Sequence, residues 1–268
     1  MAKMTVGMIG LGKMGGPIAG HIAKARFPVI GFDIDPGCCK RASRRGVKIS
    51  QNVADVGRAA DLAIVIVGYD NEVWEVCAER NGLIDVMRRG STISICSTIA
   101  VKTMDKIVRK AKRKGIHILD TPVTRAEEGA VAGNVLLLGS GDERAFARAR
   151  PVFDTFCGDI FHLGKAGCGQ VAKICNNLLL WISVVANYET FALAKRFGLN
   201  KEELISALMV STGTNGTLHR WEKMTMPWVQ KDLTIGLAFA ESLGVGLPMA
   251  GLTKQMFKLY KLPLVRGN

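Results

Sequence analysis

The setting of one lysine in this chain points to chemistry. Lys173 is the only charged residue in GCGQVAKICNN, residues 167–177, and the apolar run LLLWISVVA follows it. Burying an unpaired ammonium group is costly unless its pKa falls. A lysine whose pKa drops from about 10.4 toward neutrality becomes a usable proton donor and acceptor. The alternative is a side chain that extends from an amphipathic helix into water.

A glycine-rich turn near the N-terminus is the second candidate for chemistry. In G-L-G-K-M-G, residues 10–15, the first glycine permits a tight turn, the second lets the backbone approach a pyrophosphate, and the third allows close helix–strand packing. A helix N-terminus just after such a turn binds phosphates through its N–H groups and dipole. We therefore expect this loop to bind a dinucleotide through Gly10, Leu11, Gly12, Lys13, Met14 and Gly15.

An aspartate stands where such a loop needs an acid. Asp33 ends the second apolar segment, 23 residues after Gly10. In this position a carboxylate accepts hydrogen bonds from the adenosine ribose and repels a 2′-phosphate, which favours NAD over NADP. NADP stays possible because four nearby cations could reach a phosphate: Lys40, Arg41, Arg44 and Arg45. The alternative for the whole pattern is a structural turn with a surface aspartate.

The elements that must position these residues can be read from the pattern of residues 1–164. Short continuous apolar runs, typical of parallel strands covered on both faces, alternate with helical patterns. The expected strands are 5–10, 28–33, 62–68, 91–96, 116–120, 134–140 and 159–163. The helical segments include 14–25, 36–45, 101–114 and 142–156. This alternation predicts an α/β fold, an N-terminal Rossmann domain with a doubly wound parallel sheet.

The pattern changes near Gly164. Residues 170–197 contain neither proline nor glycine, and no later segment resembles a strand. We expect two domains, a dinucleotide-binding domain at 1–164 and an all-α substrate and dimerisation domain at 165–268.

Composition excludes some classes and leaves others open. The chain has 268 residues and a formal charge of +13, which favours anionic partners without choosing among them. Seven cysteines form no C-x-x-C pair and no metal-ligand spacing with histidine, so we expect reduced thiols and no metal site. The apolar run 178–186 is shorter than the roughly 20 residues of a membrane span. We expect a cytoplasmic protein without a membrane partner.

Four motifs in order resemble the β-hydroxyacid dehydrogenase family, which includes 3-hydroxyisobutyrate dehydrogenase and tartronate semialdehyde reductase and is related to 6-phosphogluconate dehydrogenase. They are the nucleotide loop at 10–19, D-T-P-V-T-R-A-E-E-G-A-V-A-G at 120–133, G-C-G-Q-V-A-K-I-C-N-N at 167–177 and K-D-L at 231–233. The resemblance spans nearly the whole chain. It implies an NAD(P)-linked oxidoreductase acting on a small carboxylate-bearing 3-hydroxy acid, assembled as a homodimer or homotetramer.

The resemblance also implies roles for particular residues. Lys173 would exchange a proton with the substrate hydroxyl, and Asn177, one helical turn further on, would orient the substrate. Lys231 would add positive charge beside the cofactor. Thr98, with Ser97, would lie near the nicotinamide, although a helix-capping role is an open alternative. Val67 and Gly68, which end the third expected strand, would line the adenine side of the cofactor site.

The chain departs from the family in its substrate loop and near its C-terminus. Thr124-Arg125-Ala126 stands where the family usually has Ser-Gly-Gly. We hypothesise that Thr124 and Ala126 still contact substrate and that Arg125 clamps its carboxylate; the alternative is a surface pair with Glu127 or Glu128. The segment before Lys231 looks shorter than in the family, and the chain ends at KLPLVRGN without the usual final helix.

Two other functions stay open on sequence alone. One is a non-catalytic nucleotide-binding scaffold with anionic partners, because segment 102–114 carries seven basic residues and one acid. No aromatic residue interleaves with these charges, so we expect no nucleic-acid binding. The other is an imine-type reductase on the same scaffold; such relatives usually replace the lysine, and Lys173 argues for hydroxy-acid chemistry.

Overall fold

The computed structural model describes residues 3–224 and 226–259. The chain divides into two compact units, Met1–Lys173 and Ile174–Asn268. The domain boundary expected at Gly164 stays a prediction. The unusual C-terminal segment KLPLVRGN lies outside the described residues.

A single nine-stranded sheet organises the described part of the first unit. Its strands are β1 (Val6–Ile9), β2 (Val29–Phe32), β3 (Lys48–Ile49), β4 (Leu62–Val65), β5 (Thr92–Ile95), β6 (His117–Asp120), β7 (Val123–Thr124), β8 (Val135–Gly141) and β9 (Cys157–His162). They follow the order β3-β2-β1-β4-β5-β6-β8-β7, with β9 beside β8. The order reverses between β1 and β4, the point where ligands bind at the carboxyl ends of strands in such sheets.

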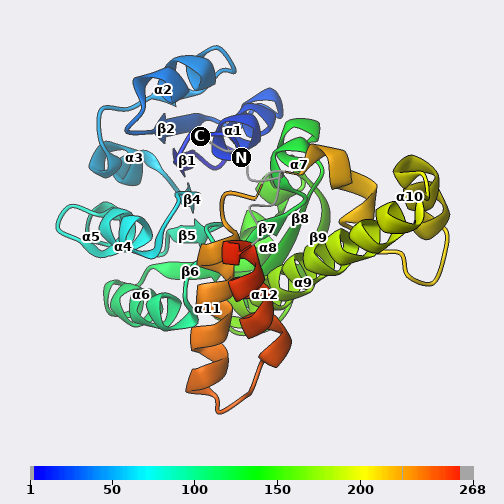
Figure 1. The fold of residues 1–268 in the computed structure, drawn as a ribbon. Helices are drawn as coiled ribbons and strands as arrows, with labels where there is room; N and C mark the ends of the chain where they lie inside the picture. Colours follow the sequence, from blue (N-terminus) through cyan, green and yellow to red (C-terminus); the bar gives the residue numbers. More distant parts are fainter. Residues whose placement is uncertain (1–2, 225, 260–268) are drawn as a thin grey trace. The chain divides into compact units, whose positions relative to one another are not determined.

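Helices cover both faces of this sheet (Figure 1). They are α1 (Gly15–Lys24), α2 (Pro36–Ser43), α3 (Val53–Ala59), α4 (Asp70–Ala78), α5 (Leu83–Val86), α6 (Val101–Lys114), α7 (Ala126–Ala132) and α8 (Glu143–Phe153). One core packs α1, α2 and α8 on the sheet through residues such as Ile18 and Phe146. The other core packs α3 to α6 through residues such as Leu83 and Ile107. Both faces of the sheet are covered at its centre, which explains the continuous apolar runs of β1, β4 and β5. The run that forms β9 is not covered in this way, because its residues are exposed or half-buried.

The predicted α/β class is confirmed, with one correction to the strand directions. The expected runs all form strands, and the structure adds the two-residue strands β3 and β7. The run at 134–140 was expected to be parallel, but β8 pairs antiparallel with β6 and β7 and is parallel only to β9. Between β6 and β8 the chain forms β7 and α7 (Ala126–Ala132), and β7 pairs antiparallel with β8, so the chain enters β8 in the direction opposite to β6.

The second unit is helical in its described residues. Its elements are the greater part of α9 (Cys168–Phe197), then α10 (Lys201–Met209), the 3₁₀ helix η1 (Leu218–Lys223), α11 (Val229–Ser242) and α12 (Pro248–Leu259). Trp181, Trp221 and Phe257 lie in its apolar core. By length and composition α9 passes the test for a membrane span, but long core helices of soluble proteins pass it too, and 39% of its most apolar window is buried.

Candidate active site

A side chain would have a different consequence at each of the three glycines of the loop after β1. Gly10 has a φ of 91°, and a Cβ atom there would lie 2.3 Å from the Ile66 carbonyl oxygen. A Cβ atom on Gly15 would lie 1.9 Å from the Gly10 carbonyl oxygen. A Cβ atom on Gly12 would meet nothing within 4 Å. The fold therefore requires Gly10 and Gly15, whereas Gly12 borders open space that a pyrophosphate would fill.

The start of α1 suits an anion. Its first turn contains no acidic side chain, and Met14 at the N-cap position makes no side-chain cap hydrogen bond. The N-terminal N–H groups of the helix and its positive dipole end therefore face no competing negative charge on the helix itself. Lys13, next in the loop, is exposed and lies 3.8 Å from Glu127.

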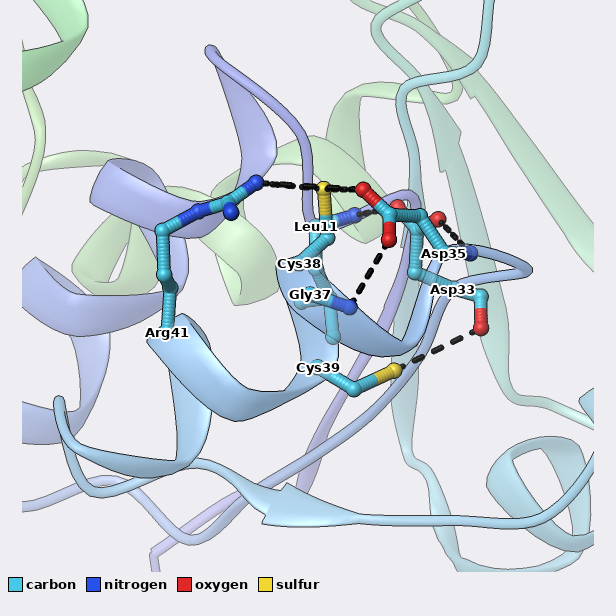
Figure 2. Close-up of polar contacts among 7 residues, drawn as sticks. All are labelled: Leu11, Asp33, Asp35, Gly37, Cys38, Cys39 and Arg41. Carbon is cyan, nitrogen blue, oxygen red and sulfur yellow. Dashed lines mark hydrogen bonds and ion pairs between the residues drawn. The ribbon is translucent and has the colours of Figure 1, made fainter.

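Asp33 links the glycine loop to the turn that follows β2 (Figure 2). Its Oδ2 accepts a hydrogen bond from the Leu11 backbone N–H at 2.6 Å, and its Oδ1 accepts one from the Asp35 N–H at 2.8 Å. A carboxylate has about four acceptor positions, so Asp33 keeps capacity for ribose hydroxyls while it is held in place.

A second carboxylate, Asp35, caps α2 beside Asp33 (Figure 2). It accepts hydrogen bonds from the Gly37 N–H at 2.7 Å and the Cys38 thiol at 3.1 Å. The hydrogen bond from Cys38 lowers the pKa of Asp35 most, and the hydrogen bond from Gly37 lowers it further. Burial and the bond to Asp35 raise the pKa of Cys38 to about 11. Asp35 therefore remains charged and Cys38 remains a thiol at neutral pH.

Arg41, one of the four cations after Asp33, is turned toward this carboxylate. Its guanidinium lies 3.9 Å from Asp35 Oδ2 and donates to Cys38 Sγ at 3.0 Å. Another of these cations, Arg45, packs along α1, close to Gly16 and Gly20.

A cavity of about 1000 Å³ joins several of the predicted cofactor residues. Gly10, Asp33 and Val67 line it, at the ends of β1 and β2 and just beyond β4. Sequence reasoning missed other lining residues, which come from α3, α4 and the loops after β2, β3 and α4: Ile34, Asn52, Arg58, Asn71, Glu72, Trp74 and Arg80. Ile34 is 90% exposed, which is unusual for an isoleucine. The only signal in the sequence is an apolar residue placed between the two aspartates Asp33 and Asp35.

The loop after β5 is tied to the loop after β4. The Ser97 hydroxyl accepts a hydrogen bond from the Val67 backbone N–H at 2.8 Å, and Ser97 is buried. The neighbouring Thr98 is half-buried. The Gly68 N–H donates to Glu72 at the start of α4. Val67 thus connects the cavity to the Ser97–Thr98 segment, and the predicted contact of Thr98 with the nicotinamide stays a prediction.

Lys173 lies near the N-terminus of α9 and is half-buried. Its Nζ donates a hydrogen bond to the Val123 carbonyl oxygen at 2.7 Å. Val123 and Thr124 form β7, so the ammonium group is held at the segment predicted to bind substrate. Asn177 follows one turn later on α9 and is 5% exposed. The predicted roles of Lys173, Thr124 and Asn177 agree with these placements but are not tested by them.

Arg125 and Ala126 retain a backbone shape that glycine normally adopts. Their φ values are 75° and 50°, in the left-handed region. The Arg125 guanidinium donates to Asn134 Oδ1 at 2.9 Å and pairs with Asp159, whereas Glu127 pairs with Lys13. The partner of Arg125 is therefore neither Glu127 nor Glu128, the two surface partners we considered. The substrate clamp stays a prediction, and Ala126 is exposed in the same loop.

Lys231 belongs to the second unit, on α11. Its Nζ lies 5.3 Å from the centroid of the Trp228 ring. The neighbouring Asp232 is buried and accepts a hydrogen bond from the Trp181 indole at 3.2 Å. Asp232 of the K-D-L motif thus has a structural role within the helical unit, and the cofactor role of Lys231 stays a prediction.

The fold and the loop after β1 are those of a dinucleotide-binding domain, and comparison with known proteins identifies the family. Residues 5–164 match the NAD binding domain of 6-phosphogluconate dehydrogenase. Residues 167–262 match the NAD-binding domain of NADP-dependent 3-hydroxyisobutyrate dehydrogenase. The chain belongs to the β-hydroxyacid dehydrogenase family. It is a dehydrogenase of hydroxy acids that uses NAD or NADP.

Individual relatives agree with this assignment. A 3-hydroxyisobutyrate dehydrogenase of Pseudomonas aeruginosa is 31% identical over 95% of this chain and 91% of the relative. An NAD-dependent L-serine dehydrogenase of the same organism is 30% identical over 98% of this chain and 93% of the relative. A structure of Mycobacterium tuberculosis 3-hydroxyisobutyrate dehydrogenase with L-serine has a TM-score of 0.88 at 26% identity, covering 98% of this chain and 95% of that one. Imine reductase structures, at 15% identity, share the fold alone.

Proposed function

We propose that this chain catalyses the reversible oxidation of a small 3-hydroxy acid, of the 3-hydroxyisobutyrate or tartronate-semialdehyde type, with NAD as the hydride acceptor. The observation that carries the proposal is the half-buried Lys173 ammonium, bonded to the backbone of the predicted substrate segment at Val123. The names of the relatives support the substrate class, because 3-hydroxyisobutyrate and L-serine both carry a hydroxyl group on the carbon β to a carboxylate.

The chemistry divides between cofactor and protein. The bound nicotinamide supplies the hydride acceptor. In oxidation Lys173 acts as the neutral amine and takes the hydroxyl proton; in reduction the resulting ammonium returns it, so that the carbonyl forms without an alkoxide of high energy. Thr124 offers a hydroxyl from β7, and Asn177 offers an amide one turn after Lys173. We assign these two side chains to orientation of the substrate.

The carboxylates after β2 support NAD as the preferred cofactor. Asp33 and Asp35 place two negative charges at the turn where a 2′-phosphate of NADP would lie. Arg41, which could neutralise such a phosphate, faces Asp35 and Cys38 instead. Arg41 therefore does not offset the repulsion between these carboxylates and a 2′-phosphate. The ribose of NAD, with its free hydroxyls, fits this turn better than the phosphorylated ribose of NADP.

A substrate screen tests the proposed function. We would measure kcat and KM for 3-hydroxyisobutyrate, L-serine and glycerate with each of NAD and NADP. We expect turnover of at least one acid with NAD and a lower kcat/KM with NADP. Turnover of none of these acids, or of a cyclic imine only, would contradict the proposal.

Replacement of the lysine tests the mechanism. We expect Lys173→Ala to lower kcat by about 100- to 10,000-fold, the usual contribution of a general acid–base group, and to leave the NAD dissociation constant nearly unchanged. Lys173→Arg should be similarly impaired because a guanidinium does not release its proton. Lys165→Ala, which removes an exposed lysine just before α9, serves as the matched control. A Lys173→Ala enzyme with wild-type kcat would exclude the proposed proton transfer.

A further inference from the structure

A buried carboxylate anchors the start of the helix that carries Lys173. Asp120 ends β6 and is fully buried. Its Oδ2 accepts hydrogen bonds from the backbone N–H groups of Gly167 and Gln170, both at 3.0 Å, and from the Ser140 hydroxyl at 3.1 Å. Its Oδ1 accepts one from the Gln170 side-chain amide at 2.9 Å. Burial raises the pKa of Asp120, and these hydrogen bonds act in the opposite direction.

The Gln170 side chain connects this carboxylate to a different loop. Its Nε2 donates to the Ser97 carbonyl oxygen at 3.0 Å as well as to Asp120 Oδ1. Its Oε1 accepts from the Ile99 backbone N–H at 3.0 Å. The amide therefore uses both its donor and its acceptor groups on the segment 97–99 and on β6. A carboxylate at this position could accept from Ile99 but could not donate to Ser97 or Asp120.

Two candidate active-site elements meet at this amide. Thr98 lies between the two residues that Gln170 binds, and the Ser97 hydroxyl holds the backbone of Val67, which lines the cofactor cavity. Gln170 and Lys173 are three residues apart on α9, a spacing that places side chains on neighbouring positions of one helix face. A shift of Gln170 would therefore move the cofactor side and the lysine side of the site relative to each other.

We propose that Gln170 is a positioning residue, which holds the segment 97–99 in a fixed relation to the first turn of α9 and so aligns the cofactor side of the site with Lys173. This inference rests on the proposed function. It assigns to Gln170 a role in the reaction without contact with the reacting atoms.

Gln170→Glu gives this idea a pH-dependent test. The introduced carboxyl group would lie beside Asp120, and two carboxylates at this distance share one proton until the pH is high enough to remove it. The Cys96 thiol, just after β5, lies near Asp120, and burial raises its pKa to about 11. Lys173 follows Gln170 by three residues on α9. With the proton present, the introduced group can still donate to Asp120. Without it, the two charges repel and the segment 97–99 separates from α9.

The measurement is NAD binding to the full-length protein by titration calorimetry between pH 6 and pH 9, expressed as the ratio of variant to wild-type dissociation constants. For Gln170→Glu we expect this ratio to rise about tenfold as the pH increases, the effect of one pKa unit of coupling. The ratio of kcat values should fall over the same range. A ratio that does not change with pH would overturn the proposal.

A charge-swapped variant separates positioning from simple loss of stability. In Asp120→Asn/Gln170→Glu, the amide of residue 120 faces the carboxylate of residue 170, and one charge remains. We expect the pH dependence to disappear in this double variant. Persistence of the pH dependence there would contradict the assignment to this pair.

Ser94→Ala is the matched control, because it removes a buried hydrogen bond to Thr121, 2.6 Å long, from the same sheet. It should lower the melting temperature without a pH-dependent change in NAD affinity. A pH-dependent change equal to that of Gln170→Glu would show that any buried defect produces the effect.

If wild-type protein binds NAD but oxidises no hydroxy acid, the proposed function fails while the binding test of Gln170 stands on its own.

Discussion

Asp33 and Asp35 differ in what holds them, although they lie two residues apart. Asp33 is bonded to backbone N–H groups of the glycine loop and of its own turn, so its place is tied to the cofactor loop. Asp35 caps α2 and faces Arg41. The first carboxylate is suited to ribose hydroxyls, and we expect the second to determine whether Arg41 is available to a phosphate beside them.

The Asp35→Asn substitution tests this division at the scale of the residue. Asparagine caps a helix as well as aspartate does, so the fold of α2 should persist. We expect the NADP dissociation constant to fall by about fivefold, a change on the order of 1 kcal/mol, because one repelling charge is removed and Arg41 is released. NAD affinity should change little. Both constants are measured by titration calorimetry.

A second substitution controls for this explanation. Arg41→Ala in the Asp35→Asn background should remove part of the gain in NADP affinity. If NADP affinity in Asp35→Asn equals that of the wild type, Asp35 has no part in the choice of cofactor.

At the scale of the element, the β1–α1 connection combines requirements of the fold with requirements of the ligand. Gly15 must lack a side chain because the Gly10 carbonyl oxygen occupies that space, and Gly12 has open space around it. The glycine-rich motif alone does not show which glycine the fold requires and which the ligand requires. The contacts that a Cβ atom would make at each position do show this.

Alanine substitutions in the loop should therefore give opposite results. We expect Gly15→Ala to destabilise the protein by several kcal/mol, because the helix must move away from the strand. We expect Gly12→Ala to leave the melting temperature of the ligand-free protein within about 2 °C of the wild type and to weaken NAD binding at least tenfold. Thermal melts with and without saturating NAD measure both. Tight NAD binding by Gly12→Ala would place the pyrophosphate elsewhere.

At the scale of the whole molecule, the second unit leaves large apolar side chains in water. On α9, Leu193 is 76% exposed and Phe197 is 84% exposed. Exposed apolar patches of this kind commonly mark protein–protein contacts. They support the expected homodimer or homotetramer, which stays a prediction, as does the cytoplasmic location.

Light scattering tests the expected self-association. We expect the wild type to have the mass of a dimer or tetramer and Leu193→Glu/Phe197→Glu to have a lower mass, because two buried charges would oppose the contact. Val131→Glu, at a 58% exposed position on α7 in the first unit, is the matched control and should not change the mass. A wild-type protein of monomer mass at micromolar concentration would contradict the expectation.

The short strands and the antiparallel pairing of β8 illustrate what pattern reading misses. β3 and β7 have two residues each, too few for a hydrophobic period, and the direction of β8 depends on which strand it meets. Gln170 belongs to the motif at 167–177, but nothing in the sequence shows that its amide contacts Asp120 and the segment 97–99.

Local sequence was sufficient for the class of fold, the cofactor loop and the candidate lysine. A turn that needs glycine, an acid at the end of a strand and apolar runs of strand length each act over a few neighbouring residues. Only the tertiary structure decided how Arg125 is paired, where Arg41 points and what Asp120 and Gln170 hold together. The contacts of Arg125, Asp120 and Gln170 join residues between nine and 73 positions apart, and packing and burial choose their partners. The contacts of Arg41 lie within α2 and its N-cap, but the sequence alone does not show which way this side chain turns.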